Sequence, residues 1–365
     1  KLDNRDGGEV SSMQGYLLRA SAIDNGEQGR IISAGKLGLD VGTGDVRNAA
    51  GGLISGWQGV QIAAGSLDNS ARGTVSSRDG ALSVKLDGSQ RVLNNSAEGA
   101  LVSKGALEVE AASLDNSANG IVSSGGDLDL RLSGALDNSG NGLIDTQGGL
   151  TANAGAVNNN AGQIGSGKAA SLNAASLDNR AGQLTSGAAL GLTFTGNLLN
   201  GQQGKLASAG PLVLKAQAVD NQSGSLISQS LLDLSASSLN NANGGTVAAR
   251  DGLSLLLAGA LNNAGGGLIH SQLGAIGIRA QGLDNTAGSL SSQGDLLLTL
   301  DGKLDNQNGQ LQSRGGNLDL QRSTSVDNRG GVLSSLTGWL KLVSAGLFDN
   351  DGGTTQAQTL DIEAQ

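Results

Sequence analysis

The tripeptide Leu-Asp-Asn, or a close variant of it, recurs along the whole chain of 365 residues. The last residue of the triplet is asparagine in every copy, and most copies follow one another after 20 to 22 residues. A period in this range is typical of solenoids and other repeat arrays, in which each repeat buries its apolar face against its neighbours. We therefore predict that residues 1–365 form one continuous repeat region and not separate domains. The asparagines are Asn4, Asn25, Asn48, Asn69, Asn95, Asn116, Asn138, Asn159, Asn179, Asn200, Asn221, Asn241, Asn263, Asn285, Asn306, Asn328 and Asn350.

The remainder of each repeat alternates as a β-strand does. A glycine such as Gly73 follows each asparagine after three or four residues, and an aliphatic-x-Ser step such as Val75-x-Ser77 comes next. A longer alternating stretch follows, for example Leu82-x-Val84-x-Leu86, and this pattern indicates a strand with one buried face. Each repeat thus predicts a long strand, a corner, a short strand, a glycine turn and a second short strand. We expect the glycine to supply a positive φ angle in that turn.

Three strands per repeat predict an all-β fold, a parallel β-helix of about 16–17 coils with about 21–22 residues per coil. Successive coils would stack at the interstrand spacing of about 4.8 Å. Leucine-rich repeats have a similar period, but they place asparagine three residues after a leucine and then add a helical segment. Here the gap is two residues and the rest of the repeat alternates, so the β-helix is favoured.

Composition agrees with a narrow, uniform core. The chain has five aromatic residues, 61 glycines, one proline and no cysteine. Its net charge of −9 argues against nucleic acid as a partner, because phosphate binding needs a basic surface. The absence of cysteine excludes disulfides and thiolate metal sites. No apolar run reaches the roughly 18–20 residues of a membrane-spanning helix, and no cofactor is expected.

The regular recurrence of the triplet has two possible explanations. The triplet could be a repeated metal ligand, or it could be a repeated structural part. The asparagine has the same strand parity as the preceding leucine, so it should point inward and bond to its copies in adjacent coils. The middle residue is usually aspartate, but it is asparagine at Asn94, arginine at Arg47 and leucine at Leu199. A calcium site would not tolerate these replacements of its carboxylate. We therefore predict that the asparagines form a structural ladder and that no metal is bound.

Other candidate chemistry is sparse. The single histidine, His270, excludes a site built from several histidines and predicts a lone surface or corner side chain. The carboxylates of Glu108 and Glu110 have outward parity and belong to a solvated face. The one clearly long interval, between Asn69 and Asn95, predicts an extended turn around Asp87 to Arg91. We predict no catalytic residue, although polysaccharide lyases and hydrolases with a β-helix fold remain a remote alternative.

Three aromatic residues are candidates for a contact surface: Trp57, Trp339 and Tyr16. Each could be a platform for a sugar or a receptor, or it could cover a corner of the coil. Arg322 breaks the local alternation on the inward side, which predicts a bulge or a coil edge.

The phrase LDNSANGIVSSGGDLDLRL, from Leu114 to Leu132, resembles the haemagglutinin repeats of filamentous haemagglutinin and of CdiA-type contact-dependent growth inhibition proteins. The resemblance extends over essentially the whole chain. It implies a right-handed β-helix that is exported by an outer-membrane transporter of a two-partner secretion system. It also implies a secreted protein on the cell surface of a Gram-negative bacterium. Because the chain starts and stops inside repeats, we expect it to be a fragment of a much larger protein.

The resulting functional hypothesis is a structural rod, or stalk, in an adhesin or a contact-dependent growth inhibition effector. The stalk would extend a distal binding or toxin domain from the cell. The alternative is a receptor- or polysaccharide-binding module on one face of the same β-helix, with a target-cell receptor or a surface glycan as its partner.

Overall fold

The structure, a computed structural model, describes residues 1–87 and 91–365 and is all-β. The predicted fold class is confirmed: the strands form a parallel β-solenoid with about 21 residues per coil and about 17 coils. The chain divides into two compact units, Lys1–Gly187 and Ala188–Gln365, which are described separately below. A single solenoid that continues through both units stays a prediction.

In the first unit, each coil places one strand in each of three sheets, here named A, B and C. Sheet A contains β1 (Leu2–Asp3), β4 (Ile23–Asp24), β7 (Asp45–Arg47), β10 (Ser66–Asp68), β13 (Val92–Asn94), β16 (Ser113–Asp115), β19 (Leu136–Asp137), β22 (Ala156–Asn158) and β25 (Ser176–Asp178). Sheet B contains β2 (Glu9–Ser12), β5 (Arg30–Ser33), β8 (Leu53–Gly56), β11 (Thr74–Ser77), β14 (Ala100–Ser103), β17 (Ile121–Ser124), β20 (Leu143–Thr146), β23 (Gln163–Ser166) and β26 (Gln183–Ser186). Sheet C contains β3 (Tyr16–Arg19), β6 (Lys36–Asp40), β9 (Gly59–Ala64), β12 (Leu82–Leu86), β15 (Leu107–Ala111), β18 (Leu128–Leu132), β21 (Leu150–Asn153) and β24 (Ala170–Ala174).

The second unit repeats this arrangement. Its part of sheet A contains β28 (Leu198–Leu199), β31 (Ala218–Asp220), β34 (Ser238–Asn240), β37 (Ala260–Asn262), β40 (Gly282–Asp284), β43 (Lys303–Asp305), β46 (Ser325–Asp327) and β49 (Phe348–Asp349). Its part of sheet B contains β29 (Lys205–Ser208), β32 (Ser225–Ser228), β35 (Thr246–Ala249), β38 (Leu268–Ser271), β41 (Ser289–Ser292), β44 (Gln310–Ser313), β47 (Val332–Ser335) and β50 (Thr354–Gln356). Its part of sheet C contains β27 (Leu190–Phe194), β30 (Leu212–Lys215), β33 (Leu231–Ala236), β36 (Gly252–Leu257), β39 (Ile276–Ala280), β42 (Leu296–Leu300), β45 (Leu318–Ser323), β48 (Trp339–Ser344) and β51 (Thr359–Glu363).

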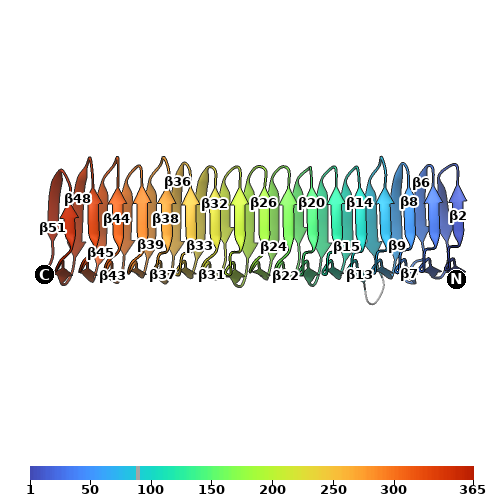
Figure 1. The fold of residues 1–365 in the computed structure, drawn as a ribbon, viewed down its shortest axis with the longest axis horizontal. Helices are drawn as coiled ribbons and strands as arrows, with labels where there is room; N and C mark the ends of the chain where they lie inside the picture. Colours follow the sequence, from blue (N-terminus) through green and yellow to red (C-terminus); the bar gives the residue numbers. More distant parts are fainter. Residues whose placement is uncertain (88–90) are drawn as a thin grey trace. The chain divides into compact units, whose positions relative to one another are not determined.

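Within a unit, the strands of successive coils lie side by side and pair in parallel (Figure 1). Equivalent residues of neighbouring repeats face one another, as Leu67 on β10 does with Val46 and Leu93 on the two adjacent strands. This register places every position of the repeat in a column that runs from coil to coil. Sequence periodicity is thereby converted into columns of like side chains.

The core is aliphatic apart from Phe194 on β27, among the described residues, and it comes from all three sheets. Leu82, Val84 and Leu86 of β12 are buried, as are Leu67 on β10 and Val75 on β11, each at most 1% exposed. Full burial of such a side chain contributes about 1.5–3 kcal/mol. The alternating pattern of the sequence therefore predicted the inward residues correctly.

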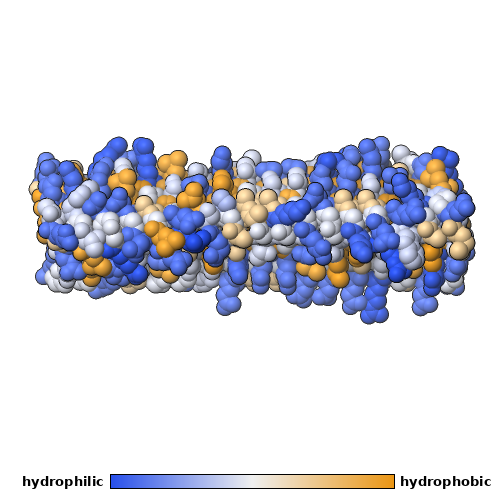
Figure 2. Space-filling view, turned by 90° about the horizontal axis from the view of Figure 1, so that it is seen from above, coloured by the Kyte–Doolittle hydropathy of each residue, from blue (hydrophilic) through white to orange (hydrophobic). Residues whose placement is uncertain are grey.

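The outer surface mixes hydrophilic residues with scattered apolar ones on the side that Figure 2 presents. In the part of the chain that the structure describes, no helix is long and apolar enough to cross a membrane.

The predicted bulge at Arg322 is confirmed. The register of β45 against β48 shifts between Leu320 and Ser323, and Arg322 has a φ of 68°. The extra residue returns Ser323 to the interior and turns the arginine outward, where its guanidinium pairs with Asp301 at 2.6 Å.

Candidate functional site

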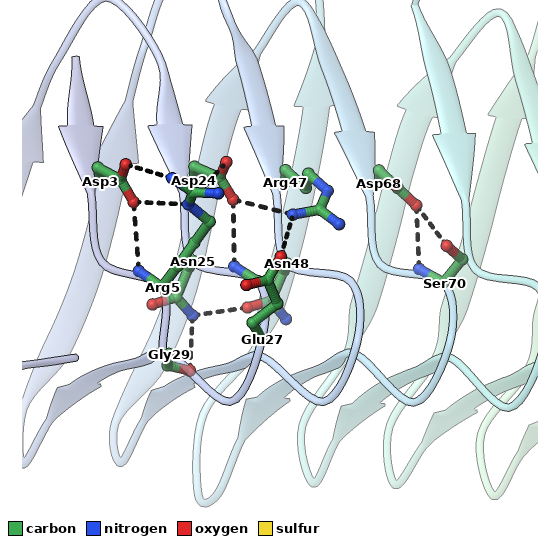
Figure 3. Close-up of polar contacts among 11 residues, drawn as sticks. Asp3, Arg5, Asp24, Asn25, Glu27, Gly29, Arg47, Asn48, Asp68 and Ser70 are labelled. Carbon is green, nitrogen blue, oxygen red and sulfur yellow. Dashed lines mark hydrogen bonds and ion pairs between the residues drawn. The ribbon is translucent and has the colours of Figure 1, made fainter. Parts of the chain in front are cut away.

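The repeated asparagines follow the strands of sheet A directly, and their side chains point into the solenoid. In the first unit all of them are completely buried except Asn4, which is 8% exposed. The Nδ2 group of Asn25 donates to Oδ1 of Asn48 in the next coil at 2.7 Å, and to the carbonyl oxygen of Gly29 in its own turn (Figure 3). A third contact joins it to the carbonyl oxygen of Leu53 at 3.1 Å. Each amide thus ties its own turn to the following coil.

The same bond repeats along the first unit at 2.7–2.8 Å, for the pairs Asn4–Asn25, Asn48–Asn69, Asn69–Asn95, Asn95–Asn116, Asn116–Asn138, Asn138–Asn159 and Asn159–Asn179. In the second unit it joins Asn200–Asn221, Asn221–Asn241, Asn241–Asn263, Asn263–Asn285, Asn285–Asn306, Asn306–Asn328 and Asn328–Asn350 at 2.6–2.8 Å. In every pair the earlier residue donates and the later one accepts. The column therefore has a direction, with amide N–H groups facing the C-terminal coil.

The glycine that directly precedes sheet B is explained by close approach and not by φ, which corrects our expectation for turns such as that of Gly73. The expectation is confirmed where a second glycine lies one residue earlier, since Gly7, Gly51, Gly244 and Gly266 have positive φ angles. A Cβ atom at Gly73 would lie 2.4 Å from the carbonyl oxygen of Asn48 and 2.7 Å from Oδ1 of Asn69. The positive φ angles of this turn belong instead to Ala71 (51°) and Arg72 (68°). In that conformation their amides donate to Ser96 and Ala97 of the next coil, at 3.2 and 3.1 Å, and these bonds offset the strain.

The middle residue of the triplet points outward and caps the same turn. Oδ1 of Asp68 accepts hydrogen bonds from the backbone amide and the hydroxyl of Ser70, at 3.2 and 2.7 Å (Figure 3). Asn94 accepts the same two bonds from Ser96. Because the turn needs only an acceptor oxygen, aspartate and asparagine are interchangeable here. The carboxylate is therefore occupied by the turn, which fits the structural interpretation better than a metal ligand.

Several of these carboxylates are stabilised in their charged form. The side-chain hydrogen bond from Arg5 lowers the pKa of Asp3 to about 2. Hydrogen bonds from Arg329 lower the pKa of Asp327, and those from Arg180 lower the pKa of Asp178, in both cases against the opposing effect of burial. The middle aspartates of the triplets form an acidic column on sheet A, and arginines two residues further along the chain neutralise part of its charge.

A second polar column lies at the corner between sheets B and C, and sequence reasoning gave it no role. The serine of the aliphatic-x-Ser step is inward and buried, as Ser77 and Ser228 are. Its hydroxyl donates to carbonyl oxygens of the corner, to Gly80 at 2.7 Å for Ser77 and to Leu231 at 2.8 Å for Ser228. The sequence signal for this inward direction is that the serine lies two residues after a buried aliphatic residue, on the same face of the strand.

The three candidate aromatic residues occupy different environments. Trp57, just before β9, is 46% exposed, and the guanidinium of Arg78 lies 4.1 Å from the centre of its ring. Trp339 begins β48 and is 41% exposed, while its amide donates to Oδ1 of Asn317 at 3.1 Å. Tyr16 is half-buried and donates to the carbonyl oxygen of Val10 at 3.3 Å, and burial raises its pKa. Their role as a contact surface stays a prediction.

A shallow hollow of about 490 Å³ lies on the outer face of sheet C in the first unit. Gly38 and Gly59 form part of it, and Lys36, Gln58 and Gln61 also line it. Gln58 directly follows Trp57 in the same corner. Of the three candidate aromatic residues, Tyr16 is among the residues that line the hollow, and Trp57 and Trp339 are not.

The remaining candidates lie on outer faces. His270 is half-buried on β38, and its Nδ1 lies 3.1 Å from the carbonyl oxygen of Ser291. Glu108 pairs with Arg131, and Glu110 pairs with Lys85 at 3.5 Å. These carboxylates take part in coil-to-coil ion pairs on sheet C.

The long interval is described only in part. Gly88–Gln90, in the predicted extended turn around Asp87 to Arg91, lie outside the described residues. Arg91 has a φ of 46° and donates from Nε to the carbonyl oxygen of Leu86 at 3.0 Å.

Comparison with known families yields one match. The family model of the haemagglutinin repeat matches residues 1–45, 32–102, 79–151, 124–194, 189–265, 267–308 and 313–365. No curated protein and no solved structure matches the chain. The matched segments cover nearly all of the sequence, including the asparagine column and the glycine turns described above. The chain therefore belongs to the haemagglutinin repeat family.

Proposed function

We propose that the chain is a rod-like stalk segment of a large secreted adhesin-type protein and that it holds a distal domain away from the cell. The asparagine column carries this proposal. The buried amide of each coil is completed by the next coil, as Asn116 is by Asn138, so a coil is stable only within a stack. A stack of equivalent coils has a length set by its number of repeats, which is the property a stalk requires.

The finer parts of the proposal rest on the family match. A secreted or surface location is typical of the haemagglutinin repeat family, and its role is structural or adhesive and not enzymatic. We propose export through an outer-membrane two-partner secretion transporter, to the surface of a Gram-negative bacterium. The distal domain would be a receptor-binding domain in an adhesin or a toxin in a contact-dependent growth inhibition effector.

Deletion of whole coils tests the stalk proposal. Removal of residues 96–159 joins Asn95 to Asn160 and takes out three complete coils while keeping the register of the columns. We expect a folded chain whose longest dimension, measured by small-angle X-ray scattering, is shorter by about 14 Å, since each coil adds about 4.8 Å. The control is a deletion that also starts at residue 96 but ends half a coil earlier, so that about two and a half coils are removed. This variant should unfold, because its strands would pair positions of the repeat that do not correspond. A folded three-coil deletion of unchanged length would contradict the proposal.

A sugar- or receptor-binding module is the second candidate, and two observations favour it: the exposed ring of Trp57, and the hollow that Tyr16 and Gln61 line. Trp57→Ala and Gln61→Ala should then weaken adhesion of the full-length protein to cells or glycans, whereas a stalk should tolerate both. Adhesion that is unchanged while the fold is intact would remove this candidate.

A further inference from the structure

Charge is distributed unevenly over the outer faces of the three sheets. In the second unit, the described strands of sheet B from β32 to β50 contain no Asp, Glu, Lys or Arg. The strands of sheet C in the same unit contain Lys215, Asp233, Arg279, Asp319, Arg322 and Lys341, among others. We name the outward side chains of β32, β35, β38, β41, β44, β47 and β50 the B face. It consists of hydroxyl, amide and aliphatic side chains with a single imidazole, that of His270.

The first unit has a shorter uncharged stretch on its own sheet B. Its strands β8, β11, β14 and β17 carry no charged residue, and Val102 and Ile121 on this face are 37% and 36% exposed. On the two preceding strands, Glu9 and Arg30 neutralise each other at 3.6 Å. Charged side chains interrupt sheet B at Asp145 on β20 and at Lys205 on β29. Each unit thus has an uncharged stretch of sheet B, although the chain as a whole has a net charge of −9.

Such a face is complementary to a copy of itself. Hydroxyl and amide groups such as those of Thr246, Ser289 and Gln310 both donate and accept hydrogen bonds, so two identical faces can satisfy each other. An acidic or basic face cannot do this, because apposed copies would bring like charges together. Two negatively charged chains therefore meet least repulsion where the B faces oppose each other.

The dimensions of the B face predict a weak contact. Four residues per strand span about 13 Å, and seven strands at about 4.8 Å span about 34 Å. Two B faces packed together would bury roughly 900 Å² in total, which is the range of transient protein interfaces. Additional repeats in a longer chain would add further area and raise the avidity.

We propose that the B face is a homotypic contact surface, which docks weakly against the B face of a second copy of the chain and pairs stalks side by side. This goes beyond the stalk function, since a stalk that only provides length needs no uncharged side.

Two serine-to-lysine variants in the second unit make a matched test. Ser289 lies on the B face, in the same column as Lys205, so a lysine fits at this position of the coil. Ser254 points outward from sheet C, in the same column as Lys341. Ser289→Lys and Ser254→Lys therefore add the same charge to equivalent kinds of surface. Sedimentation velocity of the whole chain would be measured from micromolar to millimolar concentration, at low and high salt.

We expect the parent chain to self-associate with rising concentration, and more strongly at high salt, because salt screens the repulsion between the other faces. Ser289→Lys should weaken the association at least tenfold, and Ser254→Lys should leave it within twofold of the parent. A parent chain that stays monomeric throughout would overturn the proposal. Equal loss in both variants, or association that weakens with salt, would also overturn it. Circular dichroism and thermal melting would confirm that both variants are folded.

Discussion

The Nδ2 group of Asn116 donates to Oδ1 of Asn138, 22 residues further along the chain, at a distance of 2.7 Å. The same amide also bonds to the carbonyl oxygens of Gly120 and Leu143, both at 3.1 Å. One side chain thus satisfies its own turn, the next coil and the start of a strand in that coil. No apolar residue of similar size could replace these contacts, and this explains why asparagine is present in every repeat.

Replacing Asn116 by leucine should therefore cost much more stability than the loss of one ordinary hydrogen bond. Several buried carbonyl groups would lose their partner, and each unpaired group costs about 1–3 kcal/mol. Chemical denaturation of the chain would measure the free energy of unfolding. Asn153→Leu, at an exposed position on β21, provides the control and should change it by less than about 0.5 kcal/mol. Equal effects of the two variants would show that the asparagine column does not stabilise the fold.

Asn116→Asp sharpens this prediction. The carboxylate would face three acceptor oxygens in a buried position, so the pKa of the new group should be raised well above its ordinary value. A raised folded-state pKa means that the penalty is small at acid pH and grows as pH rises above the unfolded pKa. We expect the stability difference from the parent to widen between about pH 4 and pH 7. A difference independent of pH would contradict the geometry of the column.

The glycine that follows the asparagine should be irreplaceable for a steric reason. A Cβ atom at Gly142 would lie 2.4 Å from the carbonyl oxygen of Asn116 and 2.6 Å from Oδ1 of Asn138. Gly142→Ala should destabilise the chain by at least about 1–3 kcal/mol, the usual effect of overpacking. Gly140→Ala in the same turn is the control, because Gly140 occupies the position that Ala118 holds in the preceding coil. Although Gly140 has a φ of 60°, Ala118 adopts a φ of 53°, so alanine fits there. If Gly140→Ala lowers the stability more than Gly142→Ala does, then the φ angle, and not close contact, determines where glycine is required in the turn.

Most of the fold was predictable because every coil of a solenoid repeats the same pattern of inward and outward residues. The parity of Leu67, Asn69 and Val75 fixes which side chains point inward, and their recurrence averages out single exceptions. Even the bulge at Arg322 was detectable, since it breaks an alternation that its neighbours keep.

Other features depend on relations between coils and have no local signal. Ala71 and Arg72 do not look like residues of left-handed conformation, and they adopt it because their amides bond to the next coil. The uncharged stretch of sheet B from β32 to β50 becomes visible only when the strands are placed beside one another. Candidate binding residues such as Trp57 and Trp339 were found by their rarity, and rarity does not identify a ligand.

Acid should destabilise the second unit through the aspartates of sheet A. Hydrogen bonding from Arg329 lowers the folded-state pKa of Asp327 below the ordinary value of 3.8. The stability that this provides is present above about pH 4 and is lost as the pH falls through the folded-state pKa. Asp327→Asn should make the chain less sensitive to acid in this range, since asparagine keeps the acceptor for the turn, as Asn240 does in its own coil. Asp233→Asn, at an exposed site on sheet C of the same unit, removes one carboxylate in the same way and serves as the control. Melting temperatures would be measured from pH 2 to pH 7. If the melting temperatures of the parent and of Asp327→Asn fall in parallel as the pH is lowered, Asp327 does not contribute to the acid sensitivity.

The contact between Arg78 and Trp57 gives a test of the aromatic platform. The guanidinium lies 4.1 Å from the centre of the indole ring and covers one of its faces, an interaction of about 0.5–1 kcal/mol at an exposed site. In a Trp339→Phe background, Arg78→Ala should increase the quenching of Trp57 fluorescence by acrylamide and lower stability by no more than this amount. Arg72→Ala, which removes the partner of Glu98 instead, should leave the quenching unchanged. If a sugar stacks on the ring face that Arg78 covers, it competes with the guanidinium, so Arg78→Ala should strengthen glycan binding. If glycan binding is lost together with Arg78, the arginine contacts the ligand itself and the ring is not the platform.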